Sequence, residues 1–208
     1  MKVDSVSPGQ HTEGLFRLST ITDRPLRADA RRNREKVLTA AGAAFGESGF
    51  DAQVEDIARR AGVGVGTVYR HFPTKDALVD ALAEEHFGRL ADLVEAALGQ
   101  KGDPWEIFAD TIWSAAAPAV ADVASCEIIA GHPRIVDVAA LSRQRLDDAA
   151  QTLIARARAA GSMRADATVE DVRTIMCGFG HIAAAQREGA ALSWERYLTI
   201  ALDGLRAR

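Results

Sequence analysis

The sequence predicts an all-α protein of about nine helices, and three features of the chain point to this class. Its 208 residues are 48% hydrophobic, which is enough to bury a sizeable core. Aromatic residues make up only 6% of the chain, alanine is abundant and β-branched runs are short, so a sheet is not expected. Apolar residues recur instead at spacings of three and four, the pattern of amphipathic helices.

The chain opens with an arm and a first helix. Residues 1–28 lack apolar periodicity and are rich in Ser, Thr, Gly, Pro and charged residues, so a disordered arm is expected there. From Asp29 onward apolar residues recur at helical spacing, and Gly46 and Gly49 close the segment. A helix from Asp29 to about Gly46 is therefore predicted.

Two short helices separated by three residues form the most informative part of the chain. The first is expected over 54–61 and the second over 65–71, which Pro73 ends. Gly62 lies between them, and glycine permits the positive φ that the crossing of the two helices requires. This arrangement is a helix-turn-helix, whose second helix fits the major groove of B-DNA.

The second of these helices has a core side and an outer side. Val68 is expected to face the core of a small domain, together with Val63 and Phe72. The other residues are left on the outer face and at the helix N-terminus, which attracts phosphate. These candidate DNA-binding residues are Val65, Gly66, Thr67, Tyr69, Arg70 and His71.

A long fourth helix is predicted next, with Thr74 as its N-cap and Leu98 near its end. Its apolar stripe is expected at Leu78, Leu82, His86, Leu90 and Leu93. After a linker, turn residues separate five further helices, expected at about 104–121, 125–130, 134–159, 168–188 and 193–206. The domain plan is an arm at 1–28, a three-helix DNA-binding domain at 29–76, and a helical effector-binding and dimerisation domain at 77–208.

The charges are distributed unevenly along a chain whose net charge is −4. From Arg24 to Lys75 there are ten basic and six acidic residues, whereas from Ala77 onward there are thirteen basic and nineteen acidic residues. A basic first third followed by an acidic remainder indicates a segment that binds a polyanion and a separate domain beyond it.

The pattern from Arg34 to Leu78 resembles the tetracycline-repressor (TetR) family. The matching positions include Ile57-Ala58, Ala61-Gly62-Val63, Gly66-Thr67-Val68-Tyr69, His71-Phe72, Lys75 and Leu78. The resemblance implies a homodimer that binds a pseudo-palindromic operator in double-stranded DNA. It also implies a repressor that releases this operator when a small-molecule effector enters the C-terminal domain.

Carried over residue by residue, the resemblance implies that Thr67 and Tyr69 touch DNA and that His71 and Lys75 contact phosphate. Arg70 lies where the family often places a side chain that contacts a base or a phosphate. Many members have a longer polar residue at the position of Val65, which offers only apolar contact. Direct reading of bases by this helix is therefore expected to be sparse, with more of the specificity carried by Arg70 and by two arginines of the arm, Arg24 and Arg27.

The C-terminal domain is expected to hold the effector and the dimer interface. Large apolar residues on facing helices are the candidates for contact with a mostly apolar effector: Phe108, Ile112, Trp113, Met176 and Phe179. The last helix has an apolar seam made of Trp194, Leu198, Leu202 and Leu205. With the helix from Thr168, this seam is expected to form a four-helix dimer interface, as the resemblance implies.

Two alternatives stay open at this point. One is a constitutive DNA-binding protein with a filled C-terminal domain and no effector. The other is a metal- or redox-responsive regulator, because Cys177 and His181 have metal-ligand spacing on one helix face and Cys126 and His132 could supply two more ligands. We favour the interpretation in which both cysteines are small buried apolar groups, with no metal and no cofactor.

An enzyme or a membrane protein is not expected. The sequence has no G-x-S-x-G, no Walker loop and no H-E-x-x-H. No stretch of eighteen residues is free of charge, and the first 30 residues contain no apolar block of signal-peptide length. Two cysteines cannot form a disulfide framework, which agrees with a reducing compartment. A cytoplasmic protein is therefore predicted.

Overall fold

A computed structural model describes residues 23–121 and 139–208 of the chain. Over these residues it contains eight α-helices and one short 3-10 helix, and the sole extended pairing is an isolated bridge between Met163 and Arg206. The all-helical class is confirmed, and the number of helices is close to the nine expected. The predicted helix at 125–130, with Cys126 and His132 near it, lies outside the described residues.

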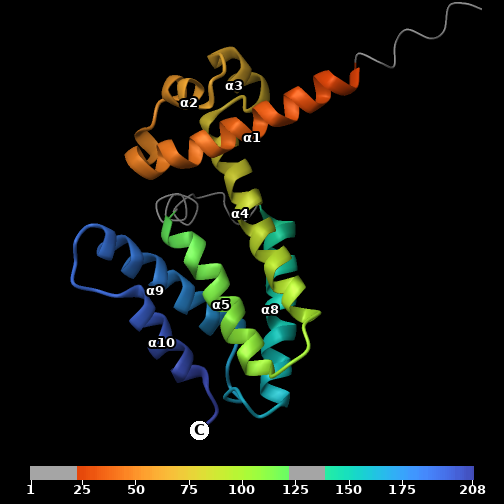
Figure 1. Cartoon of the computed structure of the whole chain (residues 1–208), viewed down its shortest axis with the longest axis vertical. Helices are drawn as coiled ribbons and strands as arrows, with labels where there is room; N and C mark the ends of the chain where they lie inside the picture. The colour runs from red at the N-terminus through yellow and green to blue at the C-terminus, as the bar shows by residue number, and fades with distance from the viewer. Residues whose placement is uncertain (1–22, 122–138) are drawn as a thin grey trace, which may run out of the picture.

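The helices form a small head above a larger body, and one long helix runs from the first into the second (Figure 1). We use "head" for residues 23–76 and "body" for the described residues from 77 onward. The elements are α1 (Asp23–Ser48), η1 (Gly49–Asp51), α2 (Val54–Ala61), α3 (Val65–His71), α4 (Lys75–Leu98), α5 (Pro104–Ala121), α8 (Ala140–Ala159), α9 (Val169–Arg187) and α10 (Trp194–Leu205). Among them, no helix is both long and apolar enough to cross a membrane.

The first helix is longer than the sequence pattern indicated. It begins at Asp23, so residues 23–28 are helical and their assignment to a disordered arm is wrong. Extending an existing helix costs little, because each added residue gains a hydrogen bond once the first turn is formed. Pro25 lies in the first turn, where a missing N–H group is tolerated. The remaining part of the predicted arm lies outside the described residues.

The helix-turn-helix is confirmed in its details. Gly62 has φ 66°, the left-handed conformation that its position between two helices demands. The N–H group of Val63 donates to the carbonyl oxygen of Ala58 at 3.0 Å and so ends α2 tightly. The apolar faces of α1, α2, α3 and the start of α4 meet in one core, whose most fully buried large side chains are Val37, Phe45, Ile57, Val68, Leu78 and Val79.

The long helix α4 starts as predicted but buries a different stripe. The Thr74 hydroxyl accepts a hydrogen bond from the N–H group of Ala77 at 3.1 Å, which caps the helix. Apart from Leu78, however, the predicted stripe is only half-buried. The buried line further along is made mostly of small residues: Val79, Ala83, Ala91, Val94 and Ala97. α4 lies along α8 (Figure 1), and small side chains let two helices approach closely, so they displace the leucines from the contact.

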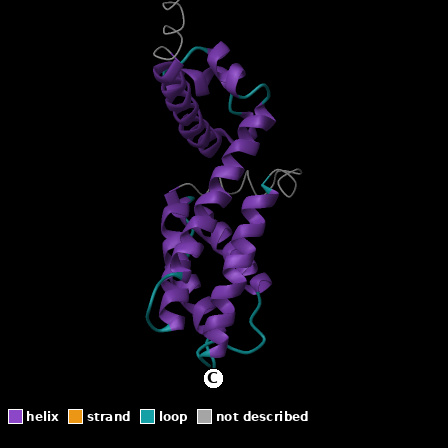
Figure 2. Ribbon diagram, turned by 90° about the vertical axis from the view of Figure 1, so that its right-hand side faces the viewer, coloured by secondary structure: helices purple, strands orange, loops and turns teal. Residues whose placement is uncertain are grey.

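The body is a bundle of α4, α5, α8, α9 and α10 (Figure 2), in which the lower part of α4 packs along α8 and also contacts α5. Thr168 and Asp171 form a capping box at the start of α9, and Ser193 caps α10. α5 runs from Pro104 to Ala121, the range predicted, and continues through Pro118. The described boundaries of α9 and α10 agree with the predicted helices to within one or two residues.

Candidate nucleic-acid interface

The second helix of the helix-turn-helix is held by its buried side and presents its other side to solvent. Val68 is fully buried and Phe72 is 3% exposed, as predicted, and Val63 is half-buried. On the opposite side Tyr69 is 46% exposed, although large aromatic residues are more often buried. Gly66 and Arg70 are exposed beside it, and Val65, Thr67 and His71 are partly exposed. The structure therefore exposes Gly66, Tyr69 and Arg70 and leaves Thr67 and His71 partly exposed, whereas Val65 packs in part against the core of the head.

Lys75 extends this surface onto the first turn of α4. Its ammonium group lies 5.9 Å from the centre of the Phe45 ring. A positive charge at the N-terminus of a helix opposes the helix dipole, so this position does not favour lysine for the stability of α4 itself. The structure places this charge beside the Phe45 ring, where α4 begins after α3.

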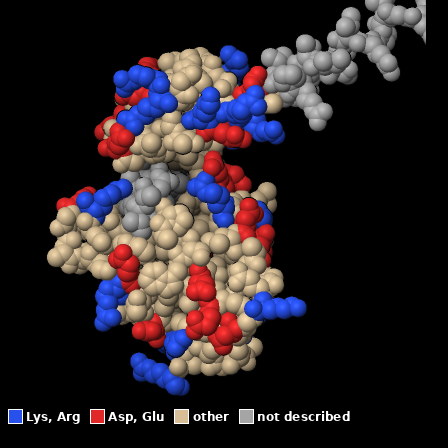
Figure 3. Space-filling model, viewed as in Figure 1, with Lys and Arg blue, Asp and Glu red and all other residues tan. Residues whose placement is uncertain are grey.

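The positive charges of the head are of two kinds, a distinction that the sequence did not reveal. Some arginines are already paired with neighbouring carboxylates: Arg59 with Asp56 at 2.5 Å, Arg60 with Glu47 at 2.5 Å, and Arg32 with Asp29. The hydrogen bond from Arg60 lowers the pKa of Glu47 below its ordinary value. Arg70, by contrast, forms no ion pair with any described residue. Figure 3 shows basic and acidic side chains interspersed over the head.

The predicted effector residues gather in the body. Phe108 and Phe179 are each 2% exposed, and Ile112 is also buried. Trp113 and Met176 are partly buried and pack against the same core. The rings of Trp113 and Phe179 lie 5.7 and 5.6 Å from the ring of Trp194, measured between centroids. The five residues thus belong to one cluster of α5, α9 and α10, and their contact with an effector stays a prediction.

The predicted dimer seam needs correction. Leu198 is fully buried and Leu202 and Leu205 are each 5% exposed, all within the core of the same chain. Trp194 is partly buried among the aromatic residues of that core. The three leucines therefore have almost no surface left for a second copy to bury, whereas Trp194 keeps part of its surface. The strongest apolar face of α10 covers the chain's own core instead.

The opposite side of α9 and α10 is the one left accessible. Ile200 is 55% exposed on α10, and Leu192 is 45% exposed just before it. Tyr197 is only partly exposed, because its hydroxyl donates to the carbonyl oxygen of Ile175 at 3.1 Å. It packs there against Gly178, where a Cβ atom would collide with the tyrosine hydroxyl. In the sequence, the signal for this accessible surface is weak. Ile200 is an apolar residue two positions after Leu198 and lies outside the predicted seam.

The cysteine and histidine candidates for a metal site do not come together in the described residues. Cys177 is an exposed free thiol, so its predicted burial is wrong for the single chain. His181, one turn further along α9, is exposed as well. Within the part of the chain that is described, no group of three His, Cys, Asp or Glu side chains could hold a metal ion. Cys126 and His132 fall outside this part.

Comparison with known families gives two matches that together cover most of the chain. The model described as "Bacterial regulatory proteins, tetR family" matches residues 37–82. The model described as "Transcriptional regulator SbtR-like, C-terminal domain" matches residues 103–207, which is half of the chain. The first match covers the helix-turn-helix and the start of α4, and the second covers the chain from the start of α5 to the end of α10.

Curated relatives match over part of the chain. The repressor KstR of Mycobacterium tuberculosis is 36% identical over 89 residues, which are 41% of this chain and 40% of KstR. The class D tetracycline repressor of Escherichia coli is 38% identical over 80 residues, 38% of this chain and 35% of the repressor. These matches span well under two thirds of the relatives' own lengths.

Solved structures match over almost the whole chain. A TetR transcription regulatory protein from Mycobacterium vanbaalenii is 35% identical, with a TM-score of 0.63, over 88% of this chain and 100% of that one. The TetR regulator SCO0520 from Streptomyces coelicolor is 34% identical, with a TM-score of 0.60, over 84% and 98% of the two chains. Because these matches and the two family models cover head and body alike, the chain belongs to the TetR family of DNA-binding transcriptional regulators.

Proposed function

We propose that this protein is an operator-binding repressor that acts as a homodimer and releases DNA when a small, mostly apolar effector binds in its body. The observation that carries the proposal is the division of α3 into a fully buried anchor at Val68 and an exposed face with Tyr69 and Arg70. A helix anchored on one side and polar on the other can enter the major groove without disturbing its own domain.

Each residue of the exposed face has a proposed role. Thr67 and Tyr69 contact the DNA in the groove, and Val65 and Gly66 offer apolar and backbone contact at the start of α3. His71 and Lys75 contact phosphate and position the helix, while Arg70 reads a base or a phosphate. Arg70 suits this role because no described carboxylate neutralises it.

The proposed dimer presents two heads to one operator. A single helix-turn-helix contacts too few base pairs for selective binding, and two copies must place their α3 helices about 34–36 Å apart to reach successive major grooves. We propose that the accessible side of α9 and α10, with Ile200 near its centre, forms the contact between copies. An apolar residue that is 55% exposed gains free energy when a partner covers it.

The connection between body and head supports effector control. α4 runs without interruption from Lys75 to Leu98. Arg145 of α8 holds the lower part of α4 through Asp92 at 2.8 Å and Glu95 at 2.7 Å. The hydrogen bonds with Glu95 and Asp92 raise the pKa of Arg145 above its ordinary value, and the one with Glu95 has the larger effect. A shift of the body helices would therefore move α4 and, with it, the head.

We further propose that the effector contacts the cluster around Trp194, with Phe108, Ile112, Trp113, Met176 and Phe179 as its surroundings. Titrating tryptophan fluorescence with apolar compounds, with and without operator DNA, tests this. By linkage, the operator must weaken effector binding by the factor by which the effector weakens operator binding, about 5–150-fold in typical cases. A compound that binds equally well in both titrations is not the inducer.

The DNA-binding role is tested with a matched pair of variants. Lys75→Ala should weaken binding to all DNA sequences and reduce the salt dependence by about one phosphate contact. Arg59→Ala is the control, because Arg59 is a basic residue of α2 that lies outside the assigned surface and is paired with Asp56 at 2.5 Å. Operator affinity is measured by fluorescence anisotropy at several salt concentrations. Equal losses in the two variants would contradict the assigned surface.

A further inference from the structure

Tyr197 of α10 is fixed against α9 at Gly178. Its hydroxyl donates a hydrogen bond to the carbonyl oxygen of Ile175 at 3.1 Å. A Cβ atom added at Gly178 would collide with the hydroxyl oxygen and would lie 3.0 Å from Cζ of the ring. Ile175 and Gly178 are three residues apart and so share one face of α9. Because Gly178 has no side chain, the tyrosine ring packs directly on the backbone of α9, and we call this contact the Tyr197–Gly178 lock.

Two neighbouring residues hold α10 in place. Leu198, which follows Tyr197, is fully buried in the core of the body. Partial burial and, less strongly, the nearby Cys177 thiol raise the pKa of Tyr197. The hydroxyl therefore keeps the proton that it donates to Ile175. With Tyr197 packed on α9 and Leu198 buried in the core, α10 has little freedom to turn about its own axis.

The lock also borders the side of α9 and α10 that remains accessible. Cys177, next to Gly178, is exposed. Ile200 follows Tyr197 by three residues, so the two are neighbours on α10, and Ile200 is 55% exposed. Tyr197 thus lies between an exposed residue of α9 and an exposed residue of α10. Its packing sets the angle at which the two helices present their common face.

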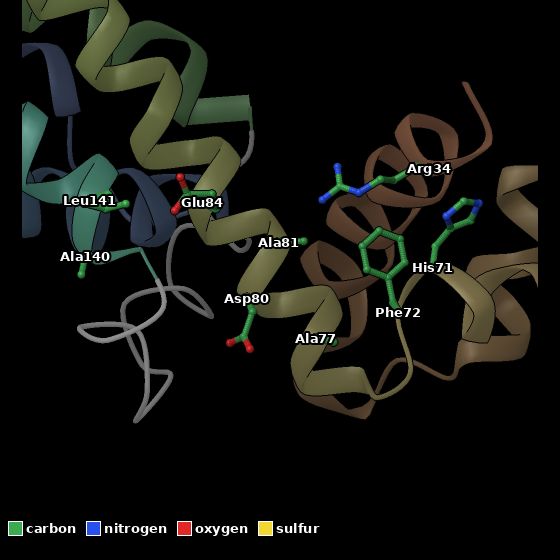
Figure 4. Close-up of a pocket in the computed structure, with 9 residues that line it drawn as sticks. All are labelled: Arg34, His71, Phe72, Ala77, Asp80, Ala81, Glu84, Ala140 and Leu141. Carbon is green, nitrogen blue, oxygen red and sulfur yellow. The ribbon is translucent and has the colours of Figure 1, made fainter. Parts of the chain in front are cut away.

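The head is carried by α4 at a distance from this face. Beside α4, a crevice of about 560 Å³ separates Phe72 of the head from Leu141 of the body (Figure 4). At about 1.5 Å per residue, the 24 residues of α4 span about 36 Å. Over this length a tilt of about 3° moves the far end by about 2 Å. In a dimer, opposite shifts of about 2 Å in the two copies would change the separation of the α3 helices by about one base-pair rise, 3.4 Å.

We propose that Tyr197 and Gly178 are positioning residues for operator binding, because their contact sets the separation of the two α3 helices in the dimer. This inference rests on the proposed homodimeric repressor, in which the accessible side of α9 and α10 joins the two copies. Both residues lie in the body and act without touching DNA. The lock determines which spacing between two half-sites the protein accepts, whereas α3 determines which bases each half-site contains.

Three variants isolate the lock. Gly178→Ala places a methyl group where the Tyr197 hydroxyl lies and so displaces the ring. Adding Tyr197→Phe to this variant removes the colliding oxygen and leaves only the contact at 3.0 Å, which a small shift of the ring relieves. Gly180→Ala is the matched control, because it makes the same substitution on α9 at a place where a Cβ atom would meet nothing within 4 Å.

Four DNA duplexes serve as probes. The wild-type protein first selects its operator from a random library, and two further duplexes carry this operator with one base pair added or removed at its centre. The fourth duplex carries a single half-site. Fluorescence anisotropy measures the affinity of each protein for all four duplexes, and analytical ultracentrifugation measures its oligomeric state.

The expected result is a change in spacing preference alone. The wild-type protein should bind the selected operator more tightly than either altered one. In Gly178→Ala this preference should fall about tenfold, because one α3 helix no longer meets its bases in register. It should return when Tyr197→Phe is added and stay unchanged in Gly180→Ala. Affinity for the single half-site should be the same in all four proteins, since their heads are identical.

A merely structural role of the lock would give a different result. Binding to all four duplexes would then weaken in parallel with the thermal unfolding temperature of each variant. That outcome, or an unchanged spacing preference in Gly178→Ala, would overturn the proposal. If Gly178→Ala does not fold, Tyr197→Ala takes its place, because it empties the lock without adding an atom. It should lower the spacing preference in the same way, and an unchanged preference would again overturn the proposal.

The wild-type protein tests the proposed function separately. A monomer in the ultracentrifuge, or selection of single half-sites from the library, would contradict the dimeric repressor and this inference with it. A wild-type dimer whose spacing preference survives both Gly178→Ala and Tyr197→Ala would contradict the positioning role alone.

Discussion

The head and the body both bury apolar helix faces, but they differ in how many faces each helix must bury. Each head helix has one apolar side that meets a single core, and its charged residues point outward or pair locally. In the body, α4 is packed along α8 and also contacts α5, and α10 has a buried face and an accessible apolar residue. Helical periodicity therefore identifies the inside of the head, whereas in the body it cannot say which neighbour a face meets.

The largest expected effect is on the core of the head. Phe45 of α1 is fully buried in the core that α1, α2, α3 and the start of α4 share, and Phe45→Ala leaves a cavity there. We expect a loss of about 3–5 kcal/mol in the free energy of unfolding. Urea unfolding followed by circular dichroism measures it. A loss below 1 kcal/mol would show that the head does not depend on one close-packed core.

The two sides of α10 provide the next test. Leu198→Ala should cost about 2–5 kcal/mol of stability, because the side chain is fully buried within the chain. Ile200→Asp, two residues further along and exposed, should leave the stability of the monomer nearly unchanged and shift the dimer toward monomers. Analytical ultracentrifugation and thermal unfolding separate the two effects. If Leu198→Ala dissociated the proposed dimer and Ile200→Asp did not, the interface would be formed by the seam predicted from the sequence.

A smaller effect concerns reading of DNA by the head. If Arg70 contacts a base, Arg70→Ala should cost about 1–3 kcal/mol of binding at one operator position and little at the others. Affinities for a set of singly substituted operators measure this. If Arg70 contacted only phosphate, the loss of affinity would be the same for every operator in the set. Arg59→Ala is the control, because Arg59 is paired with Asp56.

The smallest effect concerns one ion pair of the head, the one between Arg60 and Glu47. Arg60 lowers the pKa of Glu47, so the folded state binds the proton less readily than the unfolded chain. The pair's contribution is therefore present above the unfolded pKa and is lost as pH falls through the lowered folded pKa. Glu47→Gln should flatten this part of the stability profile at acidic pH. In an Arg60→Gln background the same substitution should change nothing, which a pH series of urea unfolding curves checks.

The sequence by itself determined the fold class, the limits of α2 and α3, and the side of α3 that is exposed. Those inferences rest on local physics: a glycine at φ 66°, a threonine cap and one apolar face per short helix. Local rules need no knowledge of which helices become neighbours. They also predict that Tyr69 and Arg70 are exposed, because both point away from the side of α3 that Val68 anchors in the core.

The tertiary structure decided which faces of the long helices meet. α8 approaches α4 along alanines, so the leucine stripe of α4 is only half-buried. The seam of α10 is covered by the rest of its own chain, so Leu198 is not available to a partner. Ile200, on the other face of α10, is accessible. The structure alone also showed that Arg59 and Arg60 are paired, while Arg70 forms no ion pair with a described residue. An apolar stripe or a charge has the same sequence pattern whichever group covers it, and only the packing of distant segments determines that group.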